Sequence, residues 1–199
     1  MRPLKEIQDL FQAHGNVVHT AQLRAAKVFY EDIQRLMQDG VIEKIKQGCY
    51  YMPDNENFSE VHLIRALFPD AVLCMDTALF YYRYSDRTPG TWHLVVDKDV
   101  SRYRMKLDYP FVQAYFLEPH TLALGAMDGE IDETPVRIYD RDRVICDCLR
   151  YMGKMDRETF KKAIQGYVND PKKNVARLME YSKALRVQKK VHDLIGIWL

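Results

Sequence analysis

The stretch "VIEKIKQGCYYM", residues 41–52, constrains this chain most, because it has the pattern of a β-hairpin that needs support from elsewhere. Hydrophobic and basic residues alternate along its first arm, Gln47-Gly48 form the turn, and Cys49 begins the return arm. An isolated hairpin is only marginally stable in water. We therefore expect the preceding residues to supply a core for it.

Three short segments with helical periodicity precede the hairpin. The first, "RPLKEIQDLFQAHG", ends at Gly15, a suitable residue after a helix. The second, "HTAQLRAA", offers Thr20 as an N-cap, and the third, "VFYEDIQRLMQDG", stops at Gly40. With the hairpin they would bury one apolar core, made of Leu4, Ile7, Leu10, Phe11, Leu23, Phe29, Ile33, Leu36, Met37, Val41, Ile45 and Tyr50.

Three short helices followed by a hairpin are typical of a winged helix-turn-helix. In such modules the helix after the turn lies in the DNA major groove. The candidate DNA-binding residues are Lys27, Tyr30, Gln34, Arg35 and Gln38 on or beside the third helix, and Lys44, Lys46 and Gln47 on the wing. Residues 1–52 hold only seven Lys/Arg against six Asp/Glu, although DNA affinity depends heavily on basic side chains. A winged helix used only for protein–protein contact therefore stays open as an alternative.

The remaining sequence predicts a second domain of mixed structure. The polar stretch 53–60 is a linker, which divides the chain into a DNA-binding domain, 1–57, and a second domain, 58–199. Within the second domain, "GAMDGEIDETP" is a loop or hairpin, and a helical pattern runs from Arg141 to the end. The β-like runs are 91–97, 111–118 and 134–140. The predicted fold class is α+β: an N-terminal winged helix-turn-helix, then a small mixed α/β region closed by C-terminal helices.

The sequence does not favour an enzyme. A metal-dependent nuclease on the middle region would need clustered carboxylates with a lysine, and Asp70, Asp97, Lys98 and Asp99 are the residues that could supply them. These residues lie where strands meet turns, so solvated turn residues are the better interpretation. No nucleotide-binding loop or hydrolase motif is present, and the six histidines lack ligand spacing. We expect no cofactor and no metal.

The cysteines and the hydropathy indicate a cytoplasmic protein. The four cysteines form no Cys-x-x-Cys pair, so they are best interpreted as reduced structural thiols. No stretch approaches the roughly 18 apolar residues of a membrane span, and the N-terminus lacks the apolar region of a secretory signal.

Three parts of the chain resemble the AbiE-type antitoxins, the transcriptional regulators of type IV toxin–antitoxin systems linked to abortive phage infection. The first is the winged helix closing on "IKQGCYYM", and the second is "DTALFYYRYSDRTPGTWHLVV". The third is "VRIYDRDRVICDCLRY" followed by "ARLMEYSKALRV", with Arg143 and Asp147 on the family's matching Arg and Asp. The similarity runs in order over nearly the whole chain.

The resemblance implies two jobs. The winged helix would bind inverted repeats in its own promoter and repress the operon. The C-terminal region would counteract a nucleotidyltransferase-like toxin, without requiring a stable complex with it. Residues 141–199 hold fourteen Lys/Arg against seven Asp/Glu, and the candidate effector surface is Arg143, Arg150, Lys161, Lys162, Lys172, Lys173, Arg177, Lys189 and Lys190. The spacing of Arg143 and Asp147 is equally typical of a surface ion pair worth a few tenths of a kcal/mol, on the order of 0.3.

Overall fold

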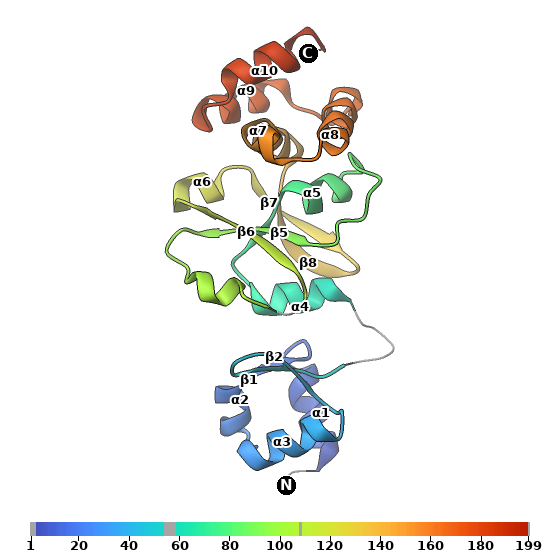
Figure 1. The fold of residues 1–199 in the computed structure, drawn as a ribbon, viewed down its shortest axis with the longest axis vertical. Helices are drawn as coiled ribbons and strands as arrows, with labels where there is room; N and C mark the ends of the chain where they lie inside the picture. The colour runs from blue at the N-terminus through green and yellow to red at the C-terminus, as the bar shows by residue number, and fades with distance from the viewer. Residues whose placement is uncertain (1–2, 54–58, 108, 199) are drawn as a thin grey trace. The chain divides into compact units, whose positions relative to one another are not determined.

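The computed structural model describes residues 3–53, 59–107 and 109–198, and divides into two compact units (Figure 1). The N-terminal unit comprises Met1–Pro69 with Lys106–Pro110, and the C-terminal unit comprises Asp70–Met105 with Phe111–Leu199. Both helices and strands occur, so the protein is of the α+β class. The predicted domain boundary at residues 57 and 58, and most of the linker around it, lie outside the described residues.

The N-terminal unit contains the three predicted helices and the predicted hairpin. Its elements are α1 (Leu4–Gln12), β1 (Val17–His19), α2 (Thr20–Ala25), α3 (Tyr30–Gln38), β2 (Glu43–Lys46), β3 (Cys49–Tyr51) and α4 (Glu60–Leu67). The three strands form one antiparallel sheet in the order β1-β3-β2. Gly48 closes the hairpin with a φ of +74°, a conformation that glycine adopts without strain. The short strand β1, which the sequence did not predict, adds the third strand.

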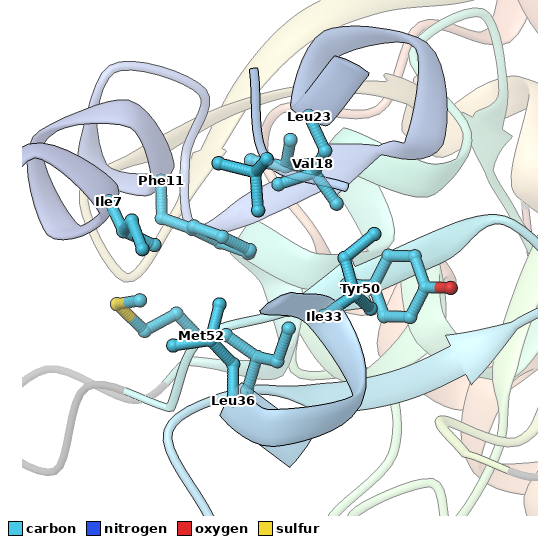
Figure 2. Close-up of a cluster of buried hydrophobic side chains, with 10 residues drawn as sticks. Ile7, Phe11, Val18, Leu23, Ile33, Leu36, Tyr50 and Met52 are labelled. Atoms are coloured by element: carbon cyan, nitrogen blue, oxygen red, sulfur yellow. The ribbon is translucent and has the colours of Figure 1, made fainter. Parts of the chain in front are cut away.

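One hydrophobic core joins the helices and strands of this unit. Figure 2 shows Ile7 and Phe11 of α1 and Leu23 of α2 pointing toward Ile33 and Leu36 of α3. Val18, Tyr50 and Met52 close the cluster from the sheet and the residue after it. The predicted core beneath the hairpin is therefore present.

Several predicted members of this core are placed differently, and one of them, Leu4 on α1, is 46% exposed. Phe29, expected to be buried, is 59% exposed, because it is the N-cap of α3 and has extended backbone angles rather than helical ones. Val28 takes the buried position instead. In the first arm of the hairpin Ile42 is fully buried, whereas Val41 and Ile45 are only half-buried.

The C-terminal unit is built on a five-stranded sheet in the order β6-β5-β4-β8-β7. Its elements are β4 (Val72–Leu73), α5 (Met75–Tyr81), β5 (Trp92–Asp97), η1 (Arg102–Met105), β6 (Val112–Leu117), α6 (Pro119–Ala123), β7 (Ala126–Ile131), β8 (Thr134–Tyr139), α7 (Arg141–Tyr151), η2 (Met152–Lys154), α8 (Arg157–Asn169), α9 (Val175–Ala184), α10 (Gln188–Leu194) and η3 (Gly196–Trp198). Strands β5 and β6 are parallel, as are β4 and β8, while β4–β5 and β7–β8 are antiparallel.

The predicted strands at 91–97, 111–118 and 134–140 correspond to β5, β6 and β8. The acidic segment before β8 forms a hairpin with it, in which Asp132 and Glu133 make the turn with positive φ values. Figure 1 shows α7–α10 gathered in one group, orange to red, and α7 contacts α5, α8, α9 and α10. No helix among the described residues has the length and apolarity that crossing a membrane requires.

Candidate nucleic-acid interface

The turn between α2 and α3 is fixed by backbone hydrogen bonds and a cap. The amide of Val28 donates to the carbonyl of Leu23 at 2.9 Å, and that of Lys27 donates to Arg24 at 2.9 Å. Lys27 has a φ of +58°, which turns the chain sharply before α3. At the start of α3 the Phe29 amide donates to the Asp32 carboxylate at 3.3 Å. The orientation of α3 is thus determined by local bonds as well as by the core.

The predicted helix residues lie on the side of α3 opposite its buried stripe. Ile33 and Leu36 face the core, whereas Tyr30, Arg35 and Gln38 are exposed and Gln34 is half-buried. Tyr30, Gln34 and Gln38 are each four residues apart, so they form one row along the helix. Lys27 is exposed just before it. All five residues are therefore accessible on or just before α3, Gln34 only in part.

The predicted wing residues differ in how they are held. Lys44 and Gln47 are exposed, and Lys44 is paired with Tyr50 in the hairpin register. The register shifts between Lys44 and Lys46, so the two lysines are not regular neighbours on one face. The ammonium of Lys46 lies 5.6 Å from the centroid of the Phe68 ring, a cation–π contact that draws it toward the protein. Lys44 is consequently the more accessible cation of the wing.

The charge of this surface is only slightly positive. Arg24, Lys27 and Lys44 are exposed, but so are the acidic Glu31 and Glu43. The half-buried Asp32 caps α3, where the helix dipole favours a negative charge. Its carboxylate is therefore occupied at the helix start.

Arg143, predicted on the effector surface, is instead completely buried, with 0% exposure. Its Nε donates to Asp147 at 3.1 Å, and its Nη1 donates to the carbonyls of Thr121 at 2.8 Å and Leu124 at 2.6 Å. The guanidinium also lies 4.1 Å from the centroid of the Tyr139 ring. The pair Arg143–Asp147 is thus a buried ion pair, and the surface pair that the spacing suggested is wrong.

The environment of this pair is closely packed. Gly125 has a φ of +77°, and a Cβ on it would lie 2.6 Å from the Cβ of Arg143. Burial raises the pKa of Asp147, while Arg143 acts to lower it. One Asp147 oxygen, Oδ1, is buried without a hydrogen-bond partner among the described residues. Through its bonds to the carbonyls of Thr121 and Leu124, Arg143 connects α7 to the end of α6.

Asp142 connects three helices from inside the unit. It accepts hydrogen bonds from the Tyr167 hydroxyl at 2.8 Å, the Asn174 amide at 2.9 Å and the Arg177 Nε at 2.7 Å. Arg177, another predicted effector residue, is thus engaged in holding α9 against α7. Asp140 caps α7 through the Arg143 amide and accepts from the Tyr181 hydroxyl.

The other predicted effector residues divide into bonded and exposed groups. Lys162 pairs with Asp86 and Glu158, each at 2.9 Å. Lys173 and Lys190 donate to backbone carbonyls. The exposed ones are Arg150, Lys161, Lys172 and Lys189. Several of the basic side chains in residues 141–199 therefore form ion pairs or hydrogen bonds within the unit.

The residues considered for a nuclease do not form a metal site. The Asp97 carboxylate accepts a hydrogen bond from the Asp99 backbone amide at 2.8 Å, within a turn. The Nζ of Lys98 lies 3.3 Å from the Oε1 of Glu118. Asp70 is exposed before β4. Within residues 3–53, 59–107 and 109–198, no group of three or more His, Cys, Asp or Glu side chains is arranged to hold a metal ion.

A polar pocket that the sequence did not indicate lies in the C-terminal unit. It has a volume of about 240 Å³ and is lined by Asp76, Ser85, Arg87, Thr88, Pro89, Gly90, Thr91, His93, Asp156 and Thr159. The Nε2 atom of His93 lies 4.0 Å from Asp76, and its Nδ1 lies 3.3 Å from the Tyr115 hydroxyl. Burial lowers the pKa of His93, and Asp76 acts to raise it. Histidines scattered in the sequence gave no sign of this grouping.

The sequence matches no protein-family model, and no curated protein is similar to it at a significant level. A functional assignment therefore depends on the chemistry of the residues themselves and on the resemblance in their motifs.

Proposed function

We propose that the N-terminal unit is a winged-helix DNA-binding domain in which α3 enters the major groove and the β2–β3 hairpin is the wing. The element order α1-β1-α2-α3-β2-β3, with one sheet joining the hairpin to β1, supports this assignment. The observation that carries it is the outward row of Tyr30, Gln34 and Gln38 on a helix whose opposite side is anchored in the core. Polar side chains on such a helix can bond to base edges.

We further propose that the chain is a cytoplasmic autorepressor and the antitoxin of a type IV toxin–antitoxin system, as its motifs imply. The DNA partner would be inverted repeats in its own promoter. The C-terminal unit would counteract a nucleotidyltransferase-like toxin without a stable complex. The proposal assigns no catalysis, cofactor or metal to the chain.

A titration of the purified full chain onto its own upstream DNA tests the first part. The titration is run at two salt concentrations, with a scrambled duplex and a Lys44→Ala/Lys46→Ala variant beside it. We expect specific binding that weakens steeply as salt rises, because phosphate contacts release counterions, and that weakens further in the variant. Absence of binding at low salt would overturn the proposal.

Protein–protein contact is the second candidate, and one observation favours it. Phe29 and Tyr30 are large exposed aromatic side chains on a surface of nearly balanced charge, and aromatic residues are enriched at protein interfaces. Salt dependence separates the candidates, because an interface of this kind lacks the steep salt slope of phosphate contacts.

Co-expression tests the antitoxin role separately. The full-length protein should restore growth to cells that express the neighbouring toxin gene, and we assign this effect to its C-terminal unit. The Lys44→Ala/Lys46→Ala variant should restore growth equally well while losing repression. If the Lys44→Ala/Lys46→Ala variant no longer restored growth, the proposal that repression and toxin neutralisation are separate functions would be wrong.

A further inference from the structure

Two large aromatic side chains project from the start of α3. Phe29 is 59% exposed and Tyr30 is 72% exposed. They occupy the N-cap and the first helical position. A single exposed apolar residue would need no explanation, but Phe29 and Tyr30 are consecutive, large and exposed, and they make the start of α3 an apolar tip. Exposed apolar patches mark contact surfaces.

The backbone beneath this aromatic tip, Phe29 and Tyr30, is held in place. Val28, immediately before it, is 1% exposed and inserts into the core. The Phe29 amide is bound by Asp32, three residues along the helix. Aromatic side chains have only two rotatable bonds, so rings on a fixed helix start lose little freedom on binding. The tip is therefore suited to a partner surface of fixed shape.

We propose that the aromatic tip packs against the C5 methyl groups of thymine in the DNA major groove. This inference rests on the proposed DNA-binding function and adds the base that the helix selects. The N-terminal residues of a recognition helix contact base edges. Thymine is the base that presents a methyl group in the major groove, and apolar side chains such as Phe contact it.

Exposed basic residues precede the tip and amide side chains follow it, while the exposed Glu31 lies directly after it. Arg24 and Lys27 are exposed in the preceding segment and can reach phosphates that flank the contacted bases. Polar Gln34 and Gln38 follow the tip along the helix, where they can bond to further base edges. An apolar tip followed by amide side chains on one helix therefore matches a groove in which a methyl-bearing base is followed by hydrogen-bonding edges.

Replacing thymine by deoxyuracil in the target duplex tests the proposal directly. The substitution removes only the C5 methyl and keeps every hydrogen-bonding edge of the base pair. The probes are duplexes of the chain's own upstream DNA in which thymines are replaced in short blocks. For the full-length wild-type protein we expect at least one block to weaken binding about fourfold per contacted methyl, the factor for burying one methyl-sized group.

Variants assign the effect to the tip. In Phe29→Ala and Tyr30→Ala the difference between thymine and deoxyuracil should shrink toward zero at the affected block. Tyr30→Phe keeps the ring and should keep the difference. Leu4→Ala is the matched control, because Leu4 is an exposed apolar residue on α1 and its loss should leave the thymine preference intact. Circular dichroism melting of each variant establishes that it is folded.

The outcomes separate this inference from the proposed function. Specific, salt-sensitive binding that ignores deoxyuracil in every block would overturn the thymine contact and leave the DNA-binding function standing. Binding that senses deoxyuracil equally in wild type and Phe29→Ala/Tyr30→Ala would move the contact elsewhere and also overturn it. Absence of specific DNA binding would overturn both, and would favour a protein partner for the tip.

Discussion

The Nε of Arg177 lies 2.7 Å from the Oδ2 of Asp142, a carboxylate with 0% exposure that also accepts hydrogen bonds from the Tyr167 hydroxyl and the Asn174 amide. One carboxylate thus binds α7 to α8 and α9. Arg177 itself is 44% exposed. The two partners of this ion pair therefore differ in how much their removal should cost.

Asp142→Ala should destabilise the C-terminal unit by about 3–5 kcal/mol, because the buried Tyr167 hydroxyl and the partly buried donors of Asn174 and Arg177 lose their acceptor. Arg177→Ala should cost less, about 1–3 kcal/mol, because the buried Asp142 carboxylate loses its cation but keeps the Tyr167 hydroxyl and the Asn174 backbone amide as donors. Urea unfolding followed by tryptophan fluorescence measures both. The two tryptophans, Trp92 and Trp198, belong to the C-terminal unit. Equal losses for the two variants would contradict the central role of Asp142.

Arg143→Met should be more destabilising than Arg143→Met/Asp147→Asn. The single variant leaves Asp147 as an uncompensated buried charge, which costs about 3–5 kcal/mol. The double variant removes that charge, and we expect it to recover about 1–3 kcal/mol at neutral pH. The same urea titration measures both, and a double variant that is no more stable than the single would show that the charge is not the cause.

The deficit of Arg143→Met should also depend on pH. Burial raises the pKa of Asp147 and Arg143 opposes this, so removing Arg143 raises the pKa further. A carboxyl with a raised pKa in the folded state binds its proton more tightly there, so stability falls as pH rises from its unfolded value of about 4. The gap between the single and double variants should therefore narrow as pH is lowered from about 7.5 to about 4.5. A gap that is constant with pH would contradict the assignment.

His93 should contribute an acid-sensitive part of stability. Burial lowers its pKa in the folded state, with Asp76 opposing. The unfolded chain therefore binds the proton more readily, and stability is lost as pH falls from about 6.5 through the lowered value. His93→Gln should flatten this part of the pH profile between about pH 7 and 5. His192→Gln, at an exposed position of the same unit, is the matched control substitution.

Much of the fold follows from local sequence pattern. The helices α1–α3 and the hairpin were predictable because apolar spacing, caps and Gly48 specify them within a few residues of chain. Strand β1 has only three residues, which is too short for a periodic pattern. Phe29 has the spacing of a buried helix residue, but it is the N-cap of α3 and lies outside the helix. Pairing of β7 with β8 depends on a turn at Asp132 and Glu133 in a conformation uncommon for these residues.

The candidate sites were less predictable because burial of charge leaves no local trace. Arg143 and Asp147 have the same spacing whether their helix face meets water or protein. All residues from Asp142 to Leu149 of α7 are buried, since α7 is covered by helices from later in the sequence as well as by α5. A count of charges along the chain could not reveal that Arg177 forms an ion pair with the buried Asp142. The grouping of Asp76, His93 and Tyr115 likewise joins residues from three separate elements.

Substitutions on α3 should change sequence preference. Gln34→Ala and Arg35→Ala remove side chains that point away from the core and can bond to base edges, so each should relax discrimination by about 1–3 kcal/mol at one base position. Competition between the upstream duplex and single-base variants of it measures this. Uniform weakening across all sequences would instead place these residues on phosphates.

Wing substitutions should change the salt dependence. Lys44→Ala removes an exposed cation, so binding should weaken on all sequences and the slope of log affinity against log salt should fall by about 0.9. Lys46→Ala should have the smaller effect, because its ammonium already lies against the Phe68 ring. Lys5→Ala, an exposed lysine on α1, is the matched control and should keep the wild-type slope. If Lys44→Ala keeps the wild-type slope while Lys5→Ala lowers it, the hairpin is not the phosphate-contacting element and α1 takes that role.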